Sequence, residues 1–184
     1  MNKAKAILFL LTQNPALADA VIDHFEKILG PTEFRGAWHL FEKKYYEEEM
    51  GADLKRCVVS FENLFEPWKL AELKRECVKI ERLPRPLRGL AMTAGRTINI
   101  DPGYVDLFKV VLASGKGGGQ KVGLAEGIYA HPLLRYEKGK WIPFEWTFPD
   151  FKADTYHGDL LKIRKSLKKD LPPPTPPYRG GEFS

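Results

Sequence analysis

The sequence predicts an α+β fold with a ferredoxin-like βαββαβ core, followed by antiparallel β-hairpins and a C-terminal helix. Two observations carry this prediction. Strand-like apolar runs and two amphipathic helical stretches alternate in the order β-α-β-β-α-β over residues 5–103. Beyond residue 103 the pattern changes to short β-rich stretches separated by glycine-containing turns, and a basic helical stretch follows them.

The first strand and the first helix have clear signals at their ends. Residues 5–12 (KAILFLLT) form a continuous apolar run, which is typical of a central strand. The helix then begins with Asn14 as its N-cap and Pro15 in the first helical position, and Gly30 ends it. Its apolar face recurs at helical spacing: Leu17, Val21, Phe25 and Ile28.

The rest of the core continues this alternation. Strands are predicted in residues 33–44 (EFRGAWHLFEKK) and 54–65 (LKRCVVSFENLF). Residues 96–103 (RTINIDPG) form the fourth strand. The second helix opens at Glu66-Pro67 and is expected to bury Leu70, Leu73, Cys77 and Ile80.

The remaining chain is predicted to form hairpins and one last helix. Strand-like residues occur at 104–114, 120–136 and 140–146, and Lys138-Gly139 is a plausible hairpin turn. Residues 154–170 form a basic helix with a docking face of Leu160, Leu161, Ile163 and Leu167. We therefore expect one α+β domain over residues 1–171 and a proline-rich, extended tail over residues 172–184.

Composition limits the classes of partner and compartment. The formal net charge of +5 favours an anionic partner, although basic proteins without such a partner are equally common. Two cysteines, Cys57 and Cys77, are too few for a disulfide framework. The apolar run near the N-terminus leads directly into a capped helix, and no run is long enough to cross a bilayer. We expect a cytoplasmic protein without a membrane partner.

Residues 112–123 (LASGKGGGQKVG) look like a phosphate-binding loop but depart from that motif. Gln120 stands where the second motif glycine belongs, and Val122 stands where a hydroxyl would hold magnesium. Strand-like residues follow, whereas phosphate binding of this kind needs the N-terminus of a helix. We predict the tip of a hairpin, in which Lys116 and Lys121 can still contact an anion together with the glycine-rich backbone.

Residues 42–56 (EKKYYEEEMGADLKR) form a second candidate region. If they are helical, Tyr45 and Glu49 share one face and Gly51 ends the turn. Glu49 is then a candidate general acid or base, or a metal ligand, with Arg56 as an anion clamp. The alternative is a solvated charged face in which lysines offset the glutamates.

Residues 99–104 (NIDPGY) form a third candidate region. Asp101, Pro102 and Gly103 are typical of an ordinary turn. In the functional interpretation, Asn99 and Asp101 lie on one face at a strand end, and Lys109 reaches the same site. In residues 145–151 (EWTFPDF), aromatic side chains flank Asp150, which favours a core plug with a satisfied acid over a site.

Several chemistries lack support in the sequence. The four histidines show no zinc-binding spacing, and no G-x-S-x-G elbow occurs. An arginine-rich stretch is either a phosphate-contacting loop or a solvated connector: Arg82, Arg85, Arg88 and Arg96. No metal site or cofactor is predicted, and Mg²⁺ enters only if the chain is an enzyme of phosphoryl transfer.

The motifs YYEEEMGADLKR, NIDPGYVDLFKVVLAS, GIYA, RYEKGKW and WTFPDF together resemble a bacterial family defined only as domain of unknown function 4416. The likeness covers nearly the whole chain up to the last helix. Two departures, Gln120-Lys121 and His131-Pro132, put any activity of that family in doubt for this chain. The resemblance implies no mechanism, but it places these residues in family motifs: Tyr45, Tyr46, Glu49, Met50, Gly51, Arg56, Asn99, Asp101, Pro102, Gly103, Tyr104, Lys109, Lys116, Trp146, Thr147 and Asp150.

These patterns leave three functions open. The first is binding of an anionic ligand (a nucleotide, a phosphorylated metabolite or RNA) where Glu49, Arg56, Asp101, Lys109 and Lys116 converge. The second is a phosphoryl-transfer or phosphodiester enzyme with Glu49 or Asp101 as the catalytic group. The third is a protein-interaction module that uses the basic last helix or the proline-rich tail. The full set of expected ligand-binding residues is Tyr45, Tyr46, Arg56, Asn99, Tyr104, Lys109, Lys116 and Asp150.

Overall fold

The computed structural model describes residues 3–82 and 97–172 and shows an α+β fold built on one antiparallel sheet. None of the helices in these residues is long and apolar enough to cross a membrane. In chain order the elements are β1 (Ala4–Thr12), α1 (Pro15–Leu29), β2 (Thr32–Arg35), β3 (His39–Leu40), α2 (Lys44–Met50), β4 (Lys55–Phe65), the 3-10 turn η1 (Pro67–Lys69), α3 (Leu70–Arg82), β5 (Ile98–Val105), β6 (Lys109–Ser114), β7 (Val122–Ala125), β8 (Ile128–Glu137), β9 (Lys140–Pro143), α4 (Pro149–Lys152) and α5 (His157–Asp170).

The sheet has nine strands with β1 in its interior. The main strand order is β2-β4-β1-β5-β6-β8-β7, with β3 added to β4 and β9 added to β8. Every residue of β1 is buried, because β4 and β5 flank it and helices cover both faces. Burial on both faces therefore explains why the sequence of this strand is a continuous apolar run.

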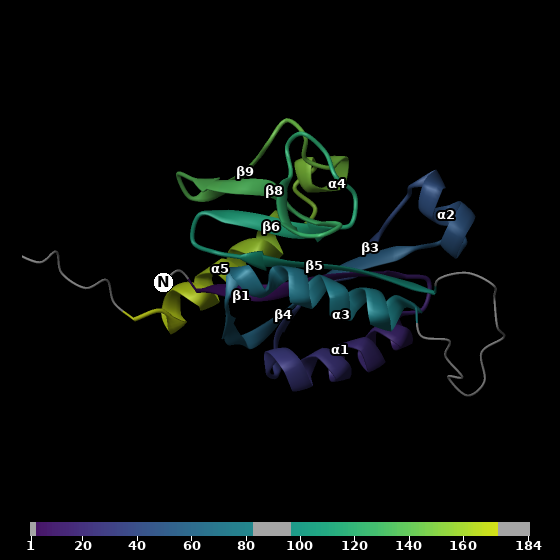
Figure 1. The fold of residues 1–184 in the computed structure, drawn as a ribbon, viewed down its shortest axis with the longest axis horizontal. Helices are drawn as coiled ribbons and strands as arrows, with labels where there is room; N and C mark the ends of the chain where they lie inside the picture. Colours follow the sequence, from purple (N-terminus) through teal and green to yellow (C-terminus); the bar gives the residue numbers. More distant parts are fainter. Residues whose placement is uncertain (1–2, 83–96, 173–184) are drawn as a thin grey trace, which may run out of the picture.

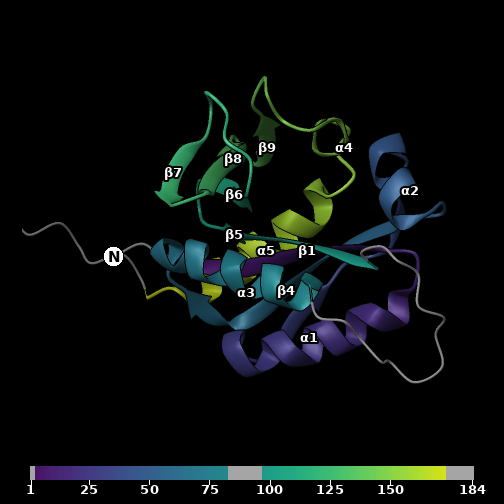
Figure 2. The ribbon, with the colours of Figure 1, turned by 45° about the vertical axis from the view of Figure 1, so that its right-hand side comes forward.

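The helices form a layer on each face of the sheet (Figure 1). Helices α1 and α3 pack on one face, and their apolar residues join the even-numbered side chains of β1 in one core cluster. Helix α5 and the short α4 pack on the other face, against the odd-numbered side chains of β1. Figure 2 shows the same arrangement from another side, with β6, β7, β8 and β9 standing away from α1.

The helix signals predicted from sequence are largely confirmed. Asn14 caps α1, since its Oδ1 accepts from the Ala16 N–H at 3.0 Å. Leu17, Val21 and Phe25 are buried, but Ile28 is exposed and Leu29 is buried in its place. Because an α-helix has 3.6 residues per turn, the buried stripe of α1 passes through positions 18, 21, 22, 25 and 29. Position 28 lies outside this stripe. All four predicted core residues of the second helix are buried: Leu70, Leu73, Cys77 and Ile80.

Turn chemistry in the second half was predicted correctly at one place and incorrectly at another. Lys138 and Gly139 have φ angles of 48° and 88° and join β8 to β9 as a tight hairpin turn. The glycine-rich loop after β6, however, is not the tip of a hairpin. Strand β8 lies between β6 and β7 and pairs with both, because a tight turn containing Gly127 returns β7 directly to β8.

Two strand predictions also need correction. Residues 33–44 form two short strands rather than one, with Leu40 exposed. Asp101-Pro102-Gly103 is not a turn but the middle of β5, which pairs with β1 throughout. Gly103 is required for close packing rather than for a bend, since a Cβ there would meet the Val111 carbonyl oxygen of β6.

The last helix docks as predicted through Leu160, Ile163 and Leu167, and Leu161 is only partly buried. Among its basic residues, Lys162 pairs locally with Asp159, whereas Arg164 is partly buried and its Nε donates to the Leu107 carbonyl at 2.9 Å. Two predicted regions, the arginine-rich stretch from residue 83 to 96 and the tail from residue 173 onward, lie outside the described residues.

Candidate functional site

Arg56 on β4 is the centre of a cluster of charged side chains. Its Nη1 donates to Asp150 Oδ2 at 2.9 Å, and its Nη2 donates to Asp101 Oδ2 at 3.0 Å. Asn99 Nδ2 donates to the same Asp101 oxygen at 2.9 Å. The Nζ of Lys43 lies 3.4 Å from the other oxygen of Asp150. We call these five residues the Arg56 cluster.

Strand register brings three members of this cluster together. On the central strand β1, Leu11 pairs with Arg56 of β4 on one side and with Asn99 of β5 on the other. Asp101 lies two residues further along β5, so strand alternation returns it to the same sheet face as Asn99. The prediction that Asn99 and Asp101 share a face is therefore confirmed.

Aromatic rings enclose the guanidinium group of Arg56. Its Cζ lies between 4.8 and 5.9 Å from four ring centroids, those of Phe9, Phe41, Phe151 and Tyr156. Burial by itself lowers the pKa of this group, but the charge of Asp101 and further acidic neighbours outweigh it and raise the pKa of Arg56. Arg56 is therefore a permanently charged, desolvated group that depends on its carboxylate partners.

A second cation approaches Asp101 from α3. Strand β6 pairs with β5 only from Gly103 onward, which leaves the edge of β5 open at Asp101. Lys74 uses this opening: its Nζ donates to the Ile100 carbonyl at 3.2 Å and lies 4.0 Å from Asp101 Oδ1. Asp101 is thus held between two cations while 25% of its side chain stays exposed.

The sequence WTFPD forms the turn before α4 and the start of this helix, and its threonine anchors the turn. Thr147 is buried, and its hydroxyl donates to the Leu133 carbonyl at 2.5 Å and accepts from the Phe144 N–H at 3.0 Å. This anchor points inward, so its two neighbours, Trp146 and Phe148, point outward and are exposed. The indole of Trp146 is fixed by donation to the Pro132 carbonyl at 2.8 Å and by stacking on Phe144.

Helix α4 joins this turn to the Arg56 cluster. It begins at Pro149, and its second residue is Asp150, the partner of Arg56. Phe151 is fully buried, with its ring 5.0 Å from that of Phe9 in an edge contact. The predicted core plug with a satisfied acid is confirmed for Asp150 and Phe151.

The glycine-rich loop between β6 and β7 meets α2 beside this cluster. The Nζ of Lys116 lies 5.2 Å from the ring centroid of Tyr45, although the two residues are far apart in sequence. The Tyr45 ring contacts the Tyr46 ring edge-on at 5.4 Å, and Tyr46 contacts Phe41 in the same way. Glu49 is exposed further along α2, which ends before Gly51 as predicted.

Lys43 links the loop and helix contacts to the turn before α4. Its Nζ lies 5.0 Å from the ring centroid of Phe41 and 5.3 Å from that of Phe148. These contacts join Lys116, Tyr45, Lys43 and Phe148, through Tyr46 and Phe41, into one region beside the Arg56 cluster, and Trp146 is exposed two residues before Phe148. We call it the lysine–aromatic surface and define it by Lys43, Tyr45, Lys116, Trp146 and Phe148.

His131 lies buried behind Phe148, with the two rings in edge contact at 5.2 Å. Burial, together with the positive charge of Lys121, lowers the pKa of His131 to about 4. Its Nε2 has no hydrogen-bond partner among residues 3–82 and 97–172. The ring is therefore neutral near pH 7 and supports Phe148 from below.

Two predicted site residues lie away from the Arg56 cluster. Lys109 forms an ion pair with Asp106 at 2.5 Å and contacts the ring of Tyr104 at 6.0 Å. Tyr104 is buried in the core beneath α1 and α3, where burial raises its pKa to about 12. Asp106 follows Asp101 by five residues of extended chain, roughly 16 Å. The structure therefore does not bring Lys109 to the site of Asp101.

Three residues of this region were missing from the sequence-based candidates: Lys43, Lys74 and Phe148. Lys43 and Phe148 lie inside the candidate stretches 42–56 and 145–151, but neither was selected as a ligand-binding residue. Nothing in the sequence indicates that Lys74 belongs to the site, because this helix residue reaches Asp101 only through the open edge of β5.

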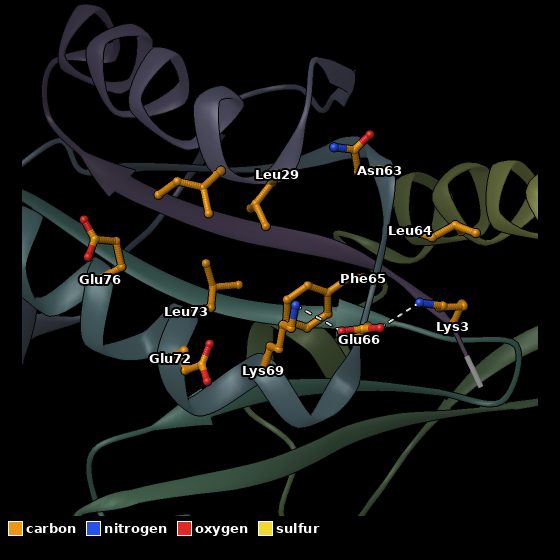
Figure 3. Close-up of a pocket in the computed structure, with 11 residues that line it drawn as sticks. Lys3, Leu29, Asn63, Leu64, Phe65, Glu66, Lys69, Glu72, Leu73 and Glu76 are labelled. Atoms are coloured by element: carbon orange, nitrogen blue, oxygen red, sulfur yellow. Dashed lines mark hydrogen bonds and ion pairs between the residues drawn. The ribbon is translucent and has the colours of Figure 1, made fainter. Parts of the chain in front are cut away.

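A pocket of about 590 Å³ lies on the opposite side of the sheet, between the end of α1 and the start of α3 (Figure 3). Leu29, Phe65 and Leu73 form apolar walls. At one side, Glu66 forms ion pairs with Lys3 at 2.9 Å and with Lys69 of η1 at 3.1 Å. None of the residues of the lysine–aromatic surface lines this pocket.

The described part of the chain contains no group of three or more His, Cys, Asp or Glu side chains that could hold a metal ion. No curated protein and no solved structure matches the chain. Residues 2–167 match the family described as domain of unknown function, DUF4416. Since this match covers most of the 184 residues, the chain belongs to the DUF4416 family.

Proposed function

We propose that the protein binds an anionic ligand on the lysine–aromatic surface. The observation that carries this proposal is the Lys116 ammonium group, held 5.2 Å above the exposed ring of Tyr45 by a glycine-rich loop. Ammonium groups bind phosphate, and exposed aromatic rings stack on bases or on the apolar faces of sugars. Both kinds of group occur together here.

The charge of Lys116 is available to a ligand. Within the described residues its ammonium group makes no ion pair, and its one charge-dependent contact is the Tyr45 ring. Lys121 lies close by: burial and the charge of Lys116 lower the pKa of Lys121. Two neighbouring lysines that repel each other favour an anion between them, which supports binding of phosphate at this loop.

A thermal-shift screen with nucleotides, phosphorylated sugars and short RNAs tests the proposal. A ligand specific for the native state raises the melting temperature, and the shift grows with the logarithm of its concentration above Kd. We expect a shift for the wild-type chain that Lys116→Ala abolishes and that Lys27→Ala, a matched loss of charge on α1, retains. A shift that survives Lys116→Ala would place the anion elsewhere, and no shift from any ligand would refute binding.

A second candidate function, catalysis at Asp101, is favoured by a specific observation. Its carboxylate is partly exposed, and Arg56, Asn99 and Lys74 orient it from three sides. An oriented carboxylate beside bound phosphate is suited to general-base chemistry, with Mg²⁺ as an added requirement in phosphoryl transfer. Asp101→Asn should abolish turnover of a phosphodiester or phosphoanhydride substrate while ligand binding persists, and Glu49→Gln tests the other predicted acid.

We also infer that β1, α1, β2, β4, α3 and β5 form a ferredoxin-like core. The chain order β-α-β-β-α-β and the spatial strand order β5-β1-β4-β2 support this inference, as does the position of α1 and α3 on one face. An experimental structure with this connectivity would establish it, and a parallel pairing among these four strands would refute it.

A further inference from the structure

We propose that the ligand of the lysine–aromatic surface is a single-stranded nucleic acid, bound with its bases against Tyr45, Trp146 and Phe148 and its phosphates beside Lys43 and Lys116. This proposal rests on the proposed function and names the class of ligand.

Exposed rings are concentrated on this surface. Tyr45, Trp146 and Phe148 are 62%, 40% and 38% exposed, and they are three of the five exposed large aromatic residues in the described parts of the chain. The other two, Trp68 and Phe108, lie on η1 and in the turn between β5 and β6. Exposed apolar groups that gather on one surface mark an interaction site more often than scattered ones do.

The rings are fixed in position before any ligand binds. Trp146 is held by its hydrogen bond to Pro132 and by its stacking on Phe144, with centroids 4.9 Å apart. Phe148 is supported by the neutral, buried ring of His131. Rigid rings lose little conformational entropy on binding, so they act as preformed stacking platforms.

The rings of this surface are themselves exposed to solvent, which favours a polymer over a small molecule enclosed in a pocket. Pockets for small ligands usually bury most of the ligand surface. Two pockets in the described residues, of about 590 and 400 Å³, are lined by other residues, with Lys3 and Leu64 common to both. A mononucleotide on the lysine–aromatic surface would stay largely solvated, whereas a strand gains affinity from each further base and phosphate along its length.

The bases must be unpaired. In a duplex the bases stack on each other and present only their edges in the grooves, so exposed tyrosine, tryptophan and phenylalanine rings have no base face to contact. In a single strand every base has a free face, and stacking on an aromatic side chain contributes about 1–3 kcal/mol per base. Lysines between the rings then lie where the backbone phosphates pass.

Fluorescence anisotropy with labelled oligonucleotides tests this class of ligand on the full chain. The probes are a ten-nucleotide oligouridine, the matching oligothymidine, a duplex of equal length and unlabelled UMP as a competitor. We expect both single strands to bind, the duplex to bind at least tenfold more weakly, and UMP to compete poorly. With the two lysines of the surface, Lys43 and Lys116, at phosphates, log K should fall with log salt at a slope of about −1.4.

Variants test whether the single-stranded nucleic acid binds at the lysine–aromatic surface. Tyr45→Ala and Phe148→Ala should each weaken binding about 5- to 150-fold, which corresponds to the loss of one stacked base. Lys27→Ala on α1 should leave the affinity unchanged, and circular dichroism melts confirm that each variant is folded. A preference for oligouridine over oligothymidine, or the reverse, identifies the natural source as RNA or DNA and supports the proposal in either case.

The outcomes separate this proposal from the proposed function. If UMP or a phosphorylated sugar binds as tightly as the ten-nucleotide strands and Lys116→Ala abolishes binding, the anion site is real but the strand proposal is wrong. Equal binding of duplex and single strand also overturns the strand proposal. If no phosphate ligand of any length binds, both proposals fail.

Discussion

Two buried cations on the same sheet face, Lys5 on β1 and Arg56 on β4, each join the sheet to the helical layer above it. Lys5 Nζ lies 2.6 Å from Asp170 at the end of α5 and 3.2 Å from Glu33 of β2. Arg56 bonds to Asp150 of α4 and to Asp101 of β5 in a similar way. Each cation thus has one carboxylate partner from the sheet and one from a helix.

The surroundings of the two cations differ. The carboxylates around Lys5 are 40% and 21% exposed, whereas those around Arg56 are 25% and 15% exposed and the guanidinium group also lies among four aromatic rings. Beside Arg56 the chain adds Asn99, Lys43 and the exposed rings. A buried cation between two carboxylates therefore joins the sheet to a helix in both places, and the proposed ligand surface lies at the Arg56 end.

The largest expected effect is that of Arg56→Met. This change leaves Asp101 and Asp150 largely buried without their main partner and replaces a guanidinium group among rings, so we expect a loss of about 3–5 kcal/mol in the free energy of unfolding. Urea denaturation followed by circular dichroism measures it. A loss below about 1 kcal/mol would show that the two carboxylates are hydrated and that the cluster is not a clamp.

The next effect concerns pH at the Arg56 end. The pKa of His131 is about 4 in the folded protein, below the ordinary value of 6.5, so the unfolded state binds more protons between these two pH values. The stability contributed by neutral His131 is present above pH 6.5 and is lost as the pH falls towards 4. The total is at most about 3 kcal/mol.

His131→Leu is the matched test of that pH dependence. The leucine does not titrate, so the fall in unfolding free energy between pH 6.5 and 4 should become shallower by up to about 1.4 kcal/mol per pH unit. Urea denaturation at several pH values provides the measurement. An unchanged slope would mean that His131 titrates alike in both states, and it would remove the pH-sensitive difference between the two ends of the sheet.

Lys5→Met should have a smaller effect than Arg56→Met, about 1–2 kcal/mol. Methionine retains the packing of the buried chain, and the more exposed carboxylates of Asp170 and Glu33 can turn to water. The same urea denaturation, run beside Arg56→Met, compares the two clamps directly. If Lys5→Met lost as much unfolding free energy as Arg56→Met, or more, the comparison would reverse and the main structural role would belong to Lys5.

The smallest effect on stability is expected on the lysine–aromatic surface. Tyr45 and Lys116 are exposed, so Tyr45→Ala and Lys116→Ala should change the free energy of unfolding by less than about 0.5 kcal/mol. Ligand affinity should nevertheless fall for both variants. A large loss of stability in the melting curves would mean that these residues serve the fold, and the functional difference between the two regions would disappear.

The elements of the fold were predictable because their signals are local. The Asn14-Pro15 cap, the Lys138-Gly139 turn and the helical spacing of Leu70, Leu73, Cys77 and Ile80 each depend on neighbours within a few residues. The half of the candidate site that depends on strand alternation, Asn99 with Asp101, was predictable for the same reason. The failure at Asp101-Pro102-Gly103 shows the limit: turn-forming residues stay extended when pairing with β1 outweighs their local preference.

By itself, the sequence determined most of the longer helices and strands, which of their faces are apolar, and that Asp150 and Arg56 are candidates. Only the tertiary structure decided which of the candidates meet. Arg56 reaches Asp101 across 45 residues and Asp150 across 94 residues of chain, and Lys116 reaches Tyr45 through a loop that bypasses β8. Such contacts depend on strand register and on the packing of α4 against the sheet, and these follow from the energy of the whole core rather than from any local stretch.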